Sequence, residues 1–305
     1  MLIIWQKGRV IKFLISIGFF VGDYVCRLTM RLLGQKPNST CVILYYHSVP
    51  DMQKRAFAHQ MDIVKNLTIP ISIERVPQLL PGGRYSSITF DDGFEDIISH
   101  ALPEMQKRSI PATIFVTSGC LGQLAGWWPA TAPEQKRRIA PAEKWQQLPN
   151  DLITIGSHTL THPYLSTLGE KGARRELCES RLVLQELLKR KINTFSFPYG
   201  DFNADLVRWC REAGYERIFT SLPGNAFQNG NEFISGRVEV EPTDWSLEFR
   251  LKLLGAYRWL PSAISWKRRI LSLSVSMGLK HRPPDKLVQR VVRGNTLKND
   301  TNFVS

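Results

Sequence analysis

Short apolar runs recur along most of the chain, each bounded by residues typical of turns, and helix-like segments separate them. The runs are four to eight residues long, the usual length of buried β-strands. They cover residues 41–46, 87–90, 112–117, 152–155, 194–197, 217–221 and 233–240. Between them, residues 173–189 and 204–213 have the apolar spacing of amphipathic helices. This alternation predicts an α/β barrel or sheet of mostly parallel strands, with its chemistry at the strand ends.

The first 36 residues follow one long helical pattern instead. Their longest apolar run, 13–22, is about half of the ~20 residues that a spanning helix needs. Polar side chains recur on one stripe, and apolar ones lie mostly opposite; the polar ones are Arg9, Lys12, Ser16, Asp23, Arg27 and Arg31. The pattern predicts an amphipathic helix in residues 1–36 that lies on a membrane surface. A signal anchor and a cleaved signal peptide are alternatives, although no small-x-small cleavage site follows the run.

Charge is unevenly distributed along the 305 residues, whose formal net charge is +13. Residues 1–40 contain six Lys and Arg against one acid, and residues 246–305 contain twelve against three. Residues 41–245 are left with 22 bases and 23 acids. A nucleic-acid enzyme usually concentrates positive charge around its working groove, so the nearly neutral centre argues against a nucleic-acid partner. Basic flanks rich in apolar residues favour an anionic membrane surface.

The region after residue 245 divides into two predicted parts. Residues 246–280 combine broad apolar faces with Arg, Lys, Tyr and Trp. This composition suits basic amphipathic helices that lie on a membrane or close a barrel. Residues 281–305 are polar and poor in hydrophobic residues, so we expect a flexible tail.

Five scattered cysteines include no C-x-x-C pair, which argues against a disulfide framework and against a thiolate zinc site. Free thiols in a reducing compartment are the simplest interpretation. Together with the basic flanks they predict attachment to the inner (cytoplasmic) membrane. The thiols favour its cytoplasmic face, whereas the modification of polymers commonly favours export.

Two adjacent carboxylates, Asp91 and Asp92, end the apolar run 87–90 and precede Gly93. Successive side chains of a strand diverge, so one carboxylate can bind a metal while the other moves a proton. The structural alternative is a β-turn, in which Asp-Gly is common.

His158 and His162 follow the run 152–155 at i and i+4, a spacing that would bring both imidazoles onto one face of a helical turn. With Asp92 they form a His2Asp set, and three protein ligands leave Zn²⁺ an open position for water. The pKa of that water falls from 15.7 to roughly 7. These residues predict metal-assisted hydrolysis, with Zn²⁺ as the expected cofactor and other first-row divalent metals as alternatives.

Three motifs resemble, in order, those of the polysaccharide deacetylases with a NodB homology domain, carbohydrate esterase family 4. They are TFDDG at residues 89–93, HTLTH at 158–162 and FSFPYG at 195–200. The resemblance covers about residues 40–245 and implies a distorted (β/α) barrel, here with flanking amphipathic helices. It also implies a hydrolase of carbon–nitrogen bonds other than peptide bonds, which removes N-acyl groups, generally acetyl, from amino sugars.

The resemblance implies a role for each matching residue. Asp91 would be the general base that takes a proton from metal-bound water. Asp92, His158 and His162 would hold the metal. The backbone N–H of Tyr199 would join the metal in stabilising the tetrahedral oxyanion.

The sequence departs from the family at the residue that orients the base. Ser196 stands where the third motif usually has an arginine, and Arg237 is a candidate substitute. In the long loop before residue 145, Trp127 and Trp128 are candidates to stack on a sugar ring, or to form a hydrophobic plug.

The usual acid histidine after the third motif is also missing. His47, in the segment VILYYHSV at residues 42–49, resembles the histidine that one branch of the family carries at the start of the domain. Because the first and last strands of a closed barrel are neighbours, we expect His47 to reach the site as the acid. Asp244, in a segment similar to the family's D-x-x-D-W motif, would either orient His47 or cap the following helix.

The sequence therefore predicts a membrane-associated, metal-dependent deacetylase that acts on an N-acetylated glycan, either a lipid-linked sugar precursor or a surface polysaccharide. The acyl group, acetyl or formyl, and the oligomeric state stay open. The alternative is a catalytically inactive glycan- or lipid-binding protein on the same fold, an interpretation that rests on Ser196 and on the displaced histidine.

Overall fold

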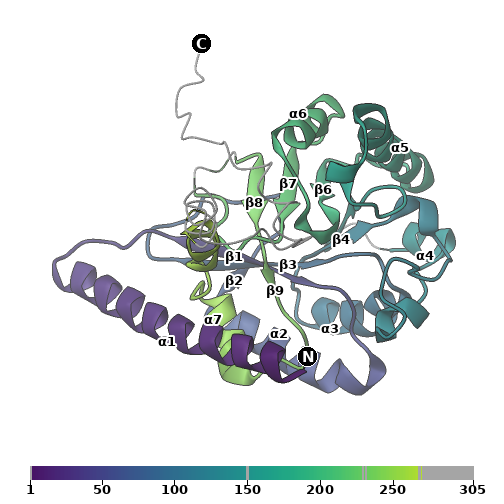
Figure 1. The fold of residues 1–305 in the computed structure, drawn as a ribbon. Coiled ribbons are helices and arrows are strands. Elements are labelled where there is room, and N and C mark those ends of the chain that lie inside the picture. Colours follow the sequence, from purple (N-terminus) through teal and green to yellow (C-terminus); the bar gives the residue numbers. More distant parts are fainter. Residues whose placement is uncertain (1, 149–150, 229, 231, 267–268, 270–305) are drawn as a thin grey trace, which may run out of the picture.

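The computed structural model describes residues 2–148, 151–228, 230, 232–266 and 269. At its centre lies a nine-stranded parallel sheet that curves into a nearly closed barrel, with helices on its outside (Figure 1). The strands follow the order β8-β7-β6-β5-β4-β3-β1-β9, and the short β2 pairs with β3. This is the parallel barrel that the alternating pattern predicted. The predicted tail, 281–305, and residues 270–280 lie outside the described residues.

The strands are short and buried, as the apolar runs indicated. Every residue of β1 and of β4 is buried, which fits a parallel sheet covered on both faces. Eight of the strands match the seven predicted runs, because the last run is divided into β8 and β9. The bounds are β1 (Thr40–Tyr46), β2 (Ile69–Pro70), β3 (Arg84–Phe90), β4 (Ala112–Val116), β5 (Ile153–Ser157), β6 (Thr194–Ser196), β7 (Arg217–Thr220), β8 (Ile234–Gly236) and β9 (Val238–Glu239).

Helices link successive strands and cover the sheet from outside (Figure 1). Two of them, α5 and α6, confirm the helical patterns read from the sequence. Helix α6 begins after Asn203, whose side chain accepts a hydrogen bond from the backbone N–H of Leu206. The helices are α1 (Leu2–Leu32), α2 (Lys54–Leu67), α3 (Leu102–Lys107), α4 (Ala142–Gln146), α5 (Glu170–Leu188), α6 (Ala204–Glu212) and α7 (Ser246–Leu253).

The extended segment 234–239 closes the sheet. Its first half, β8, pairs with β7, and its second half, β9, pairs with β1, the first strand of the barrel. Arg237 lies between the two halves, and only 1% of its surface is exposed. The expectation that the first and last strands are neighbours is thus confirmed. Closure brings the end of β1, and with it His47, beside the segment that carries Arg237 and Glu239.

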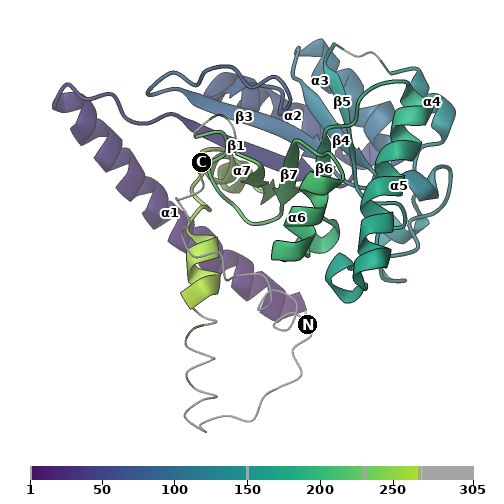
Figure 2. The same cartoon turned by 90° about the horizontal axis from the view of Figure 1, so that it is seen from above.

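The N-terminal helix α1 runs along the outside of the barrel, next to α7 (Figure 1), and Figure 2 shows it from above. Its residues Gly8–Leu32 are long and apolar enough to cross a membrane, by length and composition, so α1 can serve as a membrane anchor or signal sequence. Beyond α7, residues 260–266 are helical. Phe249 and Leu253 of α7 belong to the main hydrophobic core, so α7 packs on the barrel.

The tightest approach in the closing segment is at Gly236. A Cβ atom there would overlap the carbonyl oxygen of Leu222 and lie 3.1 Å from its carbonyl carbon. We expect Gly236→Ala to push β8 away from its neighbours and to cost about 1–3 kcal/mol in free energy of unfolding. Thermal unfolding measures this loss. Gly224→Ala is the control, because nothing lies within 4 Å of its Cβ position, and equal losses in the two variants would contradict the tight closure.

Candidate active site

The carboxyl ends of the strands surround one cavity of about 330 Å³. Six of the seven predicted site residues line it; they are His47, Asp91, Asp92, His158, His162 and Tyr199. The sequence could bring them together because each follows a strand, and the ends of parallel strands meet at one edge of a barrel. Asp244, the seventh, lies elsewhere.

Asp92, His158 and His162 form a buried cluster in this cavity. Their ligand atoms lie within 4.8 Å of one another. Asp92 Oδ1 is 3.2 Å from His162 Nε2 and 3.7 Å from His158 Nε2, so both imidazoles converge on one carboxylate oxygen. The cluster matches the predicted His2Asp set.

The hydrogen bonds around this cluster leave its ligand atoms available for a cation. His158 Nδ1 lies 2.8 Å from the carbonyl oxygen of Ser196, which fixes the tautomer with a lone pair on Nε2. Asp92 Oδ1 is buried and has no hydrogen-bond partner among the described residues. An unsatisfied buried carboxylate oxygen facing two imidazoles suits a divalent cation with N and O ligands. The residues therefore fit a metal.

Electrostatics also favour the ligand forms of these side chains. Burial lowers the pKa of His158 to about 4, so its imidazole is neutral at pH 7. Burial alone would raise the pKa of Asp92, but the neighbouring imidazole of His162 outweighs it and holds that pKa below its usual value. Asp92 is therefore a carboxylate at neutral pH.

Two tryptophans of the loop after β4 reach into this cluster, a contact that the sequence pattern did not reveal. Trp128 Nε1 donates a hydrogen bond to Asp92 Oδ2 at 3.0 Å, which turns the other carboxylate oxygen towards the imidazoles. Trp127 stacks on the His162 ring with centroids 4.5 Å apart and an angle of 15° between the planes. Both indoles are half-buried, so they are part of the site's wall.

The expected helical turn between the two histidines is not there. Strand β5 ends at Ser157, and residues 158–162 form a loop in which Thr159 and His162 have positive φ values of 68° and 62°. Glu176 of α5 holds this loop, because its carboxylate accepts hydrogen bonds from the backbone N–H groups of residues 160 and 161, both at 2.9 Å. The i,i+4 spacing alone suggested a helix, whereas a buried carboxylate from a neighbouring helix fixes a strained loop.

Arg237 makes a two-point contact with Asp91 inside the barrel. Its Nη1 and Nη2 lie 2.7 Å from Asp91 Oδ1 and Oδ2, and Nη2 also donates to Ser196 Oγ at 2.6 Å. Ser196 thus occupies the motif position of the missing arginine, and the guanidinium of Arg237, from the segment between β8 and β9, contacts Asp91 instead. The candidate substitute named from the sequence lies where an orienting arginine is needed.

This contact sets the charge of Asp91. Only 4% of the residue is exposed, and burial alone would raise its pKa. The facing guanidinium of Arg237 outweighs burial and holds the pKa of the Asp91 carboxyl below its usual value. Asp91 is therefore ionised at neutral pH, yet it lies outside the His2Asp cluster.

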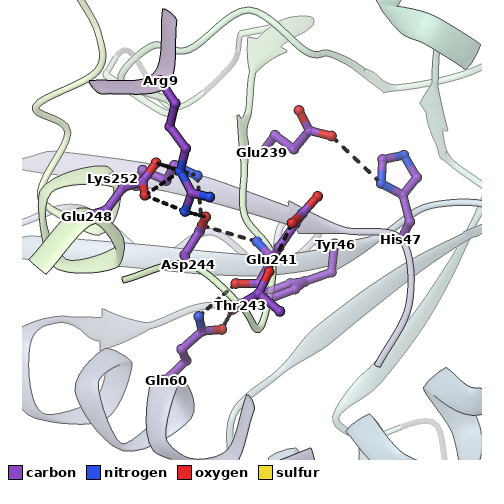
Figure 3. Close-up of polar contacts among 10 residues, drawn as sticks. All are labelled: Arg9, Tyr46, His47, Gln60, Glu239, Glu241, Thr243, Asp244, Glu248 and Lys252. Carbon is purple, nitrogen blue, oxygen red and sulfur yellow. Dashed lines mark hydrogen bonds and ion pairs between the residues drawn. The ribbon is translucent and has the colours of Figure 1, made fainter. Parts of the chain in front are cut away.

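His47 also lines the cavity, with Glu239 rather than Asp244 as its acidic neighbour. Its Nδ1 is 3.9 Å from Glu239 Oε1 (Figure 3). The register of β1 and β9 explains this, because Tyr45 pairs with Glu239 and His47 follows on the same face two residues later. Side chains two residues apart in an extended segment lie on the same face, so Glu239 could have been identified in the sequence from Arg237.

The expectation that Asp244 orients His47 does not agree with the structure. Its side chain is 4% exposed and points away from His47, towards Arg9 and Lys252 (Figure 3). Burial raises its pKa above the usual value, although Lys252 opposes the shift. The capping alternative is wrong as well, since α7 begins after Trp245 without a side-chain cap. Asp244 lies in the turn between β9 and α7, where its side chain contacts Arg9 and Lys252 instead of His47.

Tyr199 contributes both its backbone and its ring to the cavity. Its φ of 59° is left-handed, a conformation that is unusual for a tyrosine and typical of functional sites. The ring meets His162 edge-on, with centroids 4.7 Å apart, and stacks on Tyr164 at 3.8 Å. Together with the tryptophans, these rings give the cavity flat aromatic walls, the type of surface on which sugar rings stack.

Known proteins resemble this chain over part of its length. Residues 81–218 match the family described as Polysaccharide deacetylase. YxkH of Bacillus subtilis (strain 168) is 25% identical over 211 residues, 66% of this chain and 71% of that protein. The poly-beta-1,6-N-acetyl-D-glucosamine N-deacetylase of Staphylococcus aureus (strain MRSA252) is 26% identical over 156 residues, about half of each chain. The solved structure of IcaB from Ammonifex degensii shares the fold, with a TM-score of 0.58, 24% identity and coverage of 71% and 98% of the two chains.

Metal binding is the property that this geometry predicts most directly. We expect the full chain to bind one Zn²⁺, and Asp92→Ala or His158→Ala to weaken binding by at least about a hundredfold, because each removes a ligand. Trp128→Phe should cost about 10–100-fold, since it removes only the hydrogen bond that orients Asp92. Isothermal titration of the chelator-treated protein measures all three. Asp91→Asn is the control and should bind normally; unchanged affinity in the Asp92 and His158 variants would rule out this site.

Proposed function

We propose that this chain removes N-acyl groups, foremost acetyl, from an amino-sugar glycan, because its residues 81–218 match the polysaccharide deacetylase family, whose named members are hydrolases of carbon–nitrogen bonds. The observation that carries the proposal is the buried His2Asp cluster beside an ionised Asp91 in one aromatic-walled cavity. A metal site and a separate base are the two parts used in metal-assisted hydrolysis of an amide by water.

Asp92, His158 and His162 would hold the metal, and we propose Zn²⁺, with other first-row divalent ions as alternatives. When bound, a divalent cation supplies Lewis acidity, which polarises a carbonyl and lowers the pKa of water towards neutrality. The chain's own contribution is to present one oxygen and two nitrogens from three buried side chains. Trp128 and the carbonyl of Ser196 keep these atoms oriented.

Asp91 acts as the general base. It takes a proton from the water that attacks the amide carbonyl carbon, and the pair with Arg237 keeps it both ionised and fixed in position. Each carboxylate oxygen has two lone-pair directions, so the contact with Arg237 leaves room for that proton. The backbone N–H of Tyr199 stabilises the oxyanion of the tetrahedral intermediate, a contribution of about 3 kcal/mol for one such donor.

His47 acts as the general acid. When the carbon–nitrogen bond breaks, the departing amine needs a proton, and His47 lines the same cavity as Asp91 and the His2Asp cluster. Its indole neighbour, Trp128, meets the His47 ring edge-on at 5.2 Å and limits its movement. The acyl group leaves as a carboxylate, acetate when the group is acetyl.

The substrate is an N-acetylated glycan, and we propose that it is either a lipid-linked sugar precursor or a nascent surface polysaccharide. The relatives support this class, since one is named for poly-beta-1,6-N-acetyl-D-glucosamine. Helix α1 and the basic flanks support attachment to an inner-membrane surface, where both kinds of substrate occur. The free cysteines favour the cytoplasmic face.

Acetate release tests the proposal against an inactive glycan-binding protein on the same fold. The full chain loaded with Zn²⁺ should release acetate from N-acetylglucosamine oligomers, lose this activity with a chelator and regain it with metal. Binding of the oligomer without acetate release, under every metal tried, would favour the inactive alternative instead.

The pair of Asp91 and Arg237 predicts a specific pH dependence. Asp91→Asn should lower kcat by about 10²–10⁴-fold while Zn²⁺ stays bound. In Arg237→Gln, burial acts on Asp91 without the guanidinium, so its pKa should rise and the acid limb of kcat/KM should move to higher pH. Ser196→Ala is the control, because it removes one hydrogen bond to Arg237 but keeps the charge. An acid limb at the same pH in Arg237→Gln would show that Asp91 is not the base.

The role of His47 predicts a dependence on the leaving group. His47→Gln should lower kcat for an N-acetylated sugar by about 10²-fold or more, because the amine leaves unprotonated. The loss should be small for a nitrophenyl acetate ester, whose leaving group needs no proton. His100→Gln is the matched control, since His100 lies outside the cavity and bonds to the carbonyl of Val49. Equal losses on both substrates would contradict the assignment of the acid.

A further inference from the structure

One face of helix α1 is bound to the catalytic domain by buried charges. Arg9 donates to Glu248 Oε2 from Nε at 2.9 Å and from Nη2 at 2.6 Å, and Nη2 lies 3.1 Å from Asp244 Oδ1 (Figure 3). Both acidic side chains are only 4% exposed. Lys252 completes the cluster, 2.7 Å from Asp244 Oδ2. The two acids are thus balanced by two bases, one of which comes from α1.

The same face continues along the helix at helical spacing. Phe13 meets Trp245 edge-on at 5.7 Å, and Ser16, which is fully buried, accepts a hydrogen bond from Trp259 Nε1 at 2.9 Å. Further on, Asp23 pairs with Arg258. Between these polar contacts, apolar side chains of α1 pack on a small core of α7 and the residues after it; they are Phe13, Ile17 and Phe20.

These contacts make α1 part of the folded domain. Without the helix, Asp244 and Glu248 would lose Arg9 and face a single lysine, and removing one partner of a buried ion pair is strongly destabilising. A membrane-spanning position would require the same separation, and it would also draw Arg9, Asp23 and Arg27 into the bilayer. The docked face therefore disfavours both a cleaved signal peptide and a spanning anchor.

The opposite face of α1 is apolar and uncovered by the described residues. Its exposed side chains follow one another along the helix; they are Val10, Ile11, Leu14, Ile15, Val21, Val25, Leu28 and Leu32. A continuous apolar surface of this length is rare on a protein that meets only water. Exposed Lys12 and Arg31 border it, one near each end.

We propose that α1 is a permanent part of the enzyme that lies in the plane of an anionic membrane, with its polar face on the catalytic domain and its apolar face in the lipid. The cationic border complements anionic lipid headgroups. A second copy of the chain is a poorer occupant, because pairing two such faces would bring the bordering Lys12 and Arg31 side chains together. This inference deepens the membrane attachment proposed above and names the surface responsible.

Vesicle flotation of the full chain tests the surface. The chain should float with vesicles that contain phosphatidylglycerol and much less with pure phosphatidylcholine. Leu14→Glu should reduce the bound fraction by about tenfold or more, because it places a charge in the lipid-facing surface. Leu182→Glu on α5 is a matched control, since Leu14 and Leu182 are both 59% exposed, and it should float normally.

A labelling experiment separates a helix in the membrane plane from one that spans it. In a chain whose Cys26, Cys120 and Cys178 are replaced by serine, Gly8→Cys and Leu33→Cys place single accessible thiols near the two ends of α1. On intact vesicles an impermeant maleimide should label both thiols from the side of the catalytic domain. Labelling of only one end from that side would overturn the proposal.

Three further outcomes would also overturn it: a mature chain that begins after α1, equal flotation of Leu14→Glu and wild type, or a Leu14-dependent dimer that does not bind vesicles. Acetate release from a soluble oligomer, measured in parallel, keeps the two proposals apart. An active chain that does not float would refute only the membrane surface, whereas a floating chain without activity would refute only the deacetylase function.

Discussion

The closure of the parallel sheet by one extended segment is the constraint on which the site depends. Residues 234–239 pair with β7 at one end and with β1 at the other, so Arg237 is held between two edges of the barrel. From there its guanidinium reaches both oxygens of Asp91. A buried carboxylate with a fixed partner stays charged and keeps one orientation, as the proposed role of Asp91 as general base requires. The segment that closes the barrel thus also supplies the ion pair that keeps Asp91 charged.

The three proposed metal ligands are held in place by contacts with other parts of the chain. A backbone carbonyl fixes the tautomer of His158, and an indole turns the carboxylate of Asp92. The loop that ends in His162 is held in a left-handed conformation by the buried Glu176 of α5. These partners come from three different parts of the chain. Each ligand is therefore held in place by protein contacts, as expected of a site that is largely formed in advance.

Much of this arrangement follows from the sequence, because short apolar runs predict strands and parallel strands bring their ends together. Asp91, Asp92 and the two histidines could be found in this way, and the barrel's closure could be anticipated for His47. What could not be predicted depends on contacts between distant segments. The pairing register of β1 and β9 places Glu239 rather than Asp244 beside His47. The spacing of residues within a motif does not show how two distant strands pair.

The contacts of the N-terminal helix α1 could not be predicted from the sequence either. Its polar stripe was identifiable from Arg9, Ser16 and Asp23, but a stripe of charges is normally expected to face water or headgroups. Here it faces Glu248, Trp259 and Arg258 of the C-terminal region, which no local pattern could reveal.

The most direct test of the account is a stoichiometric titration. Chelator-treated full chain is given Zn²⁺ in small steps, and the rate of acetate release from an N-acetylglucosamine oligomer is measured after each step. We predict that the rate rises linearly and reaches its plateau at one Zn²⁺ per chain, bound by two imidazoles and one carboxylate. Full activity in the metal-free chain, or a plateau reached while Asp92 and the two histidines remain empty, would contradict it.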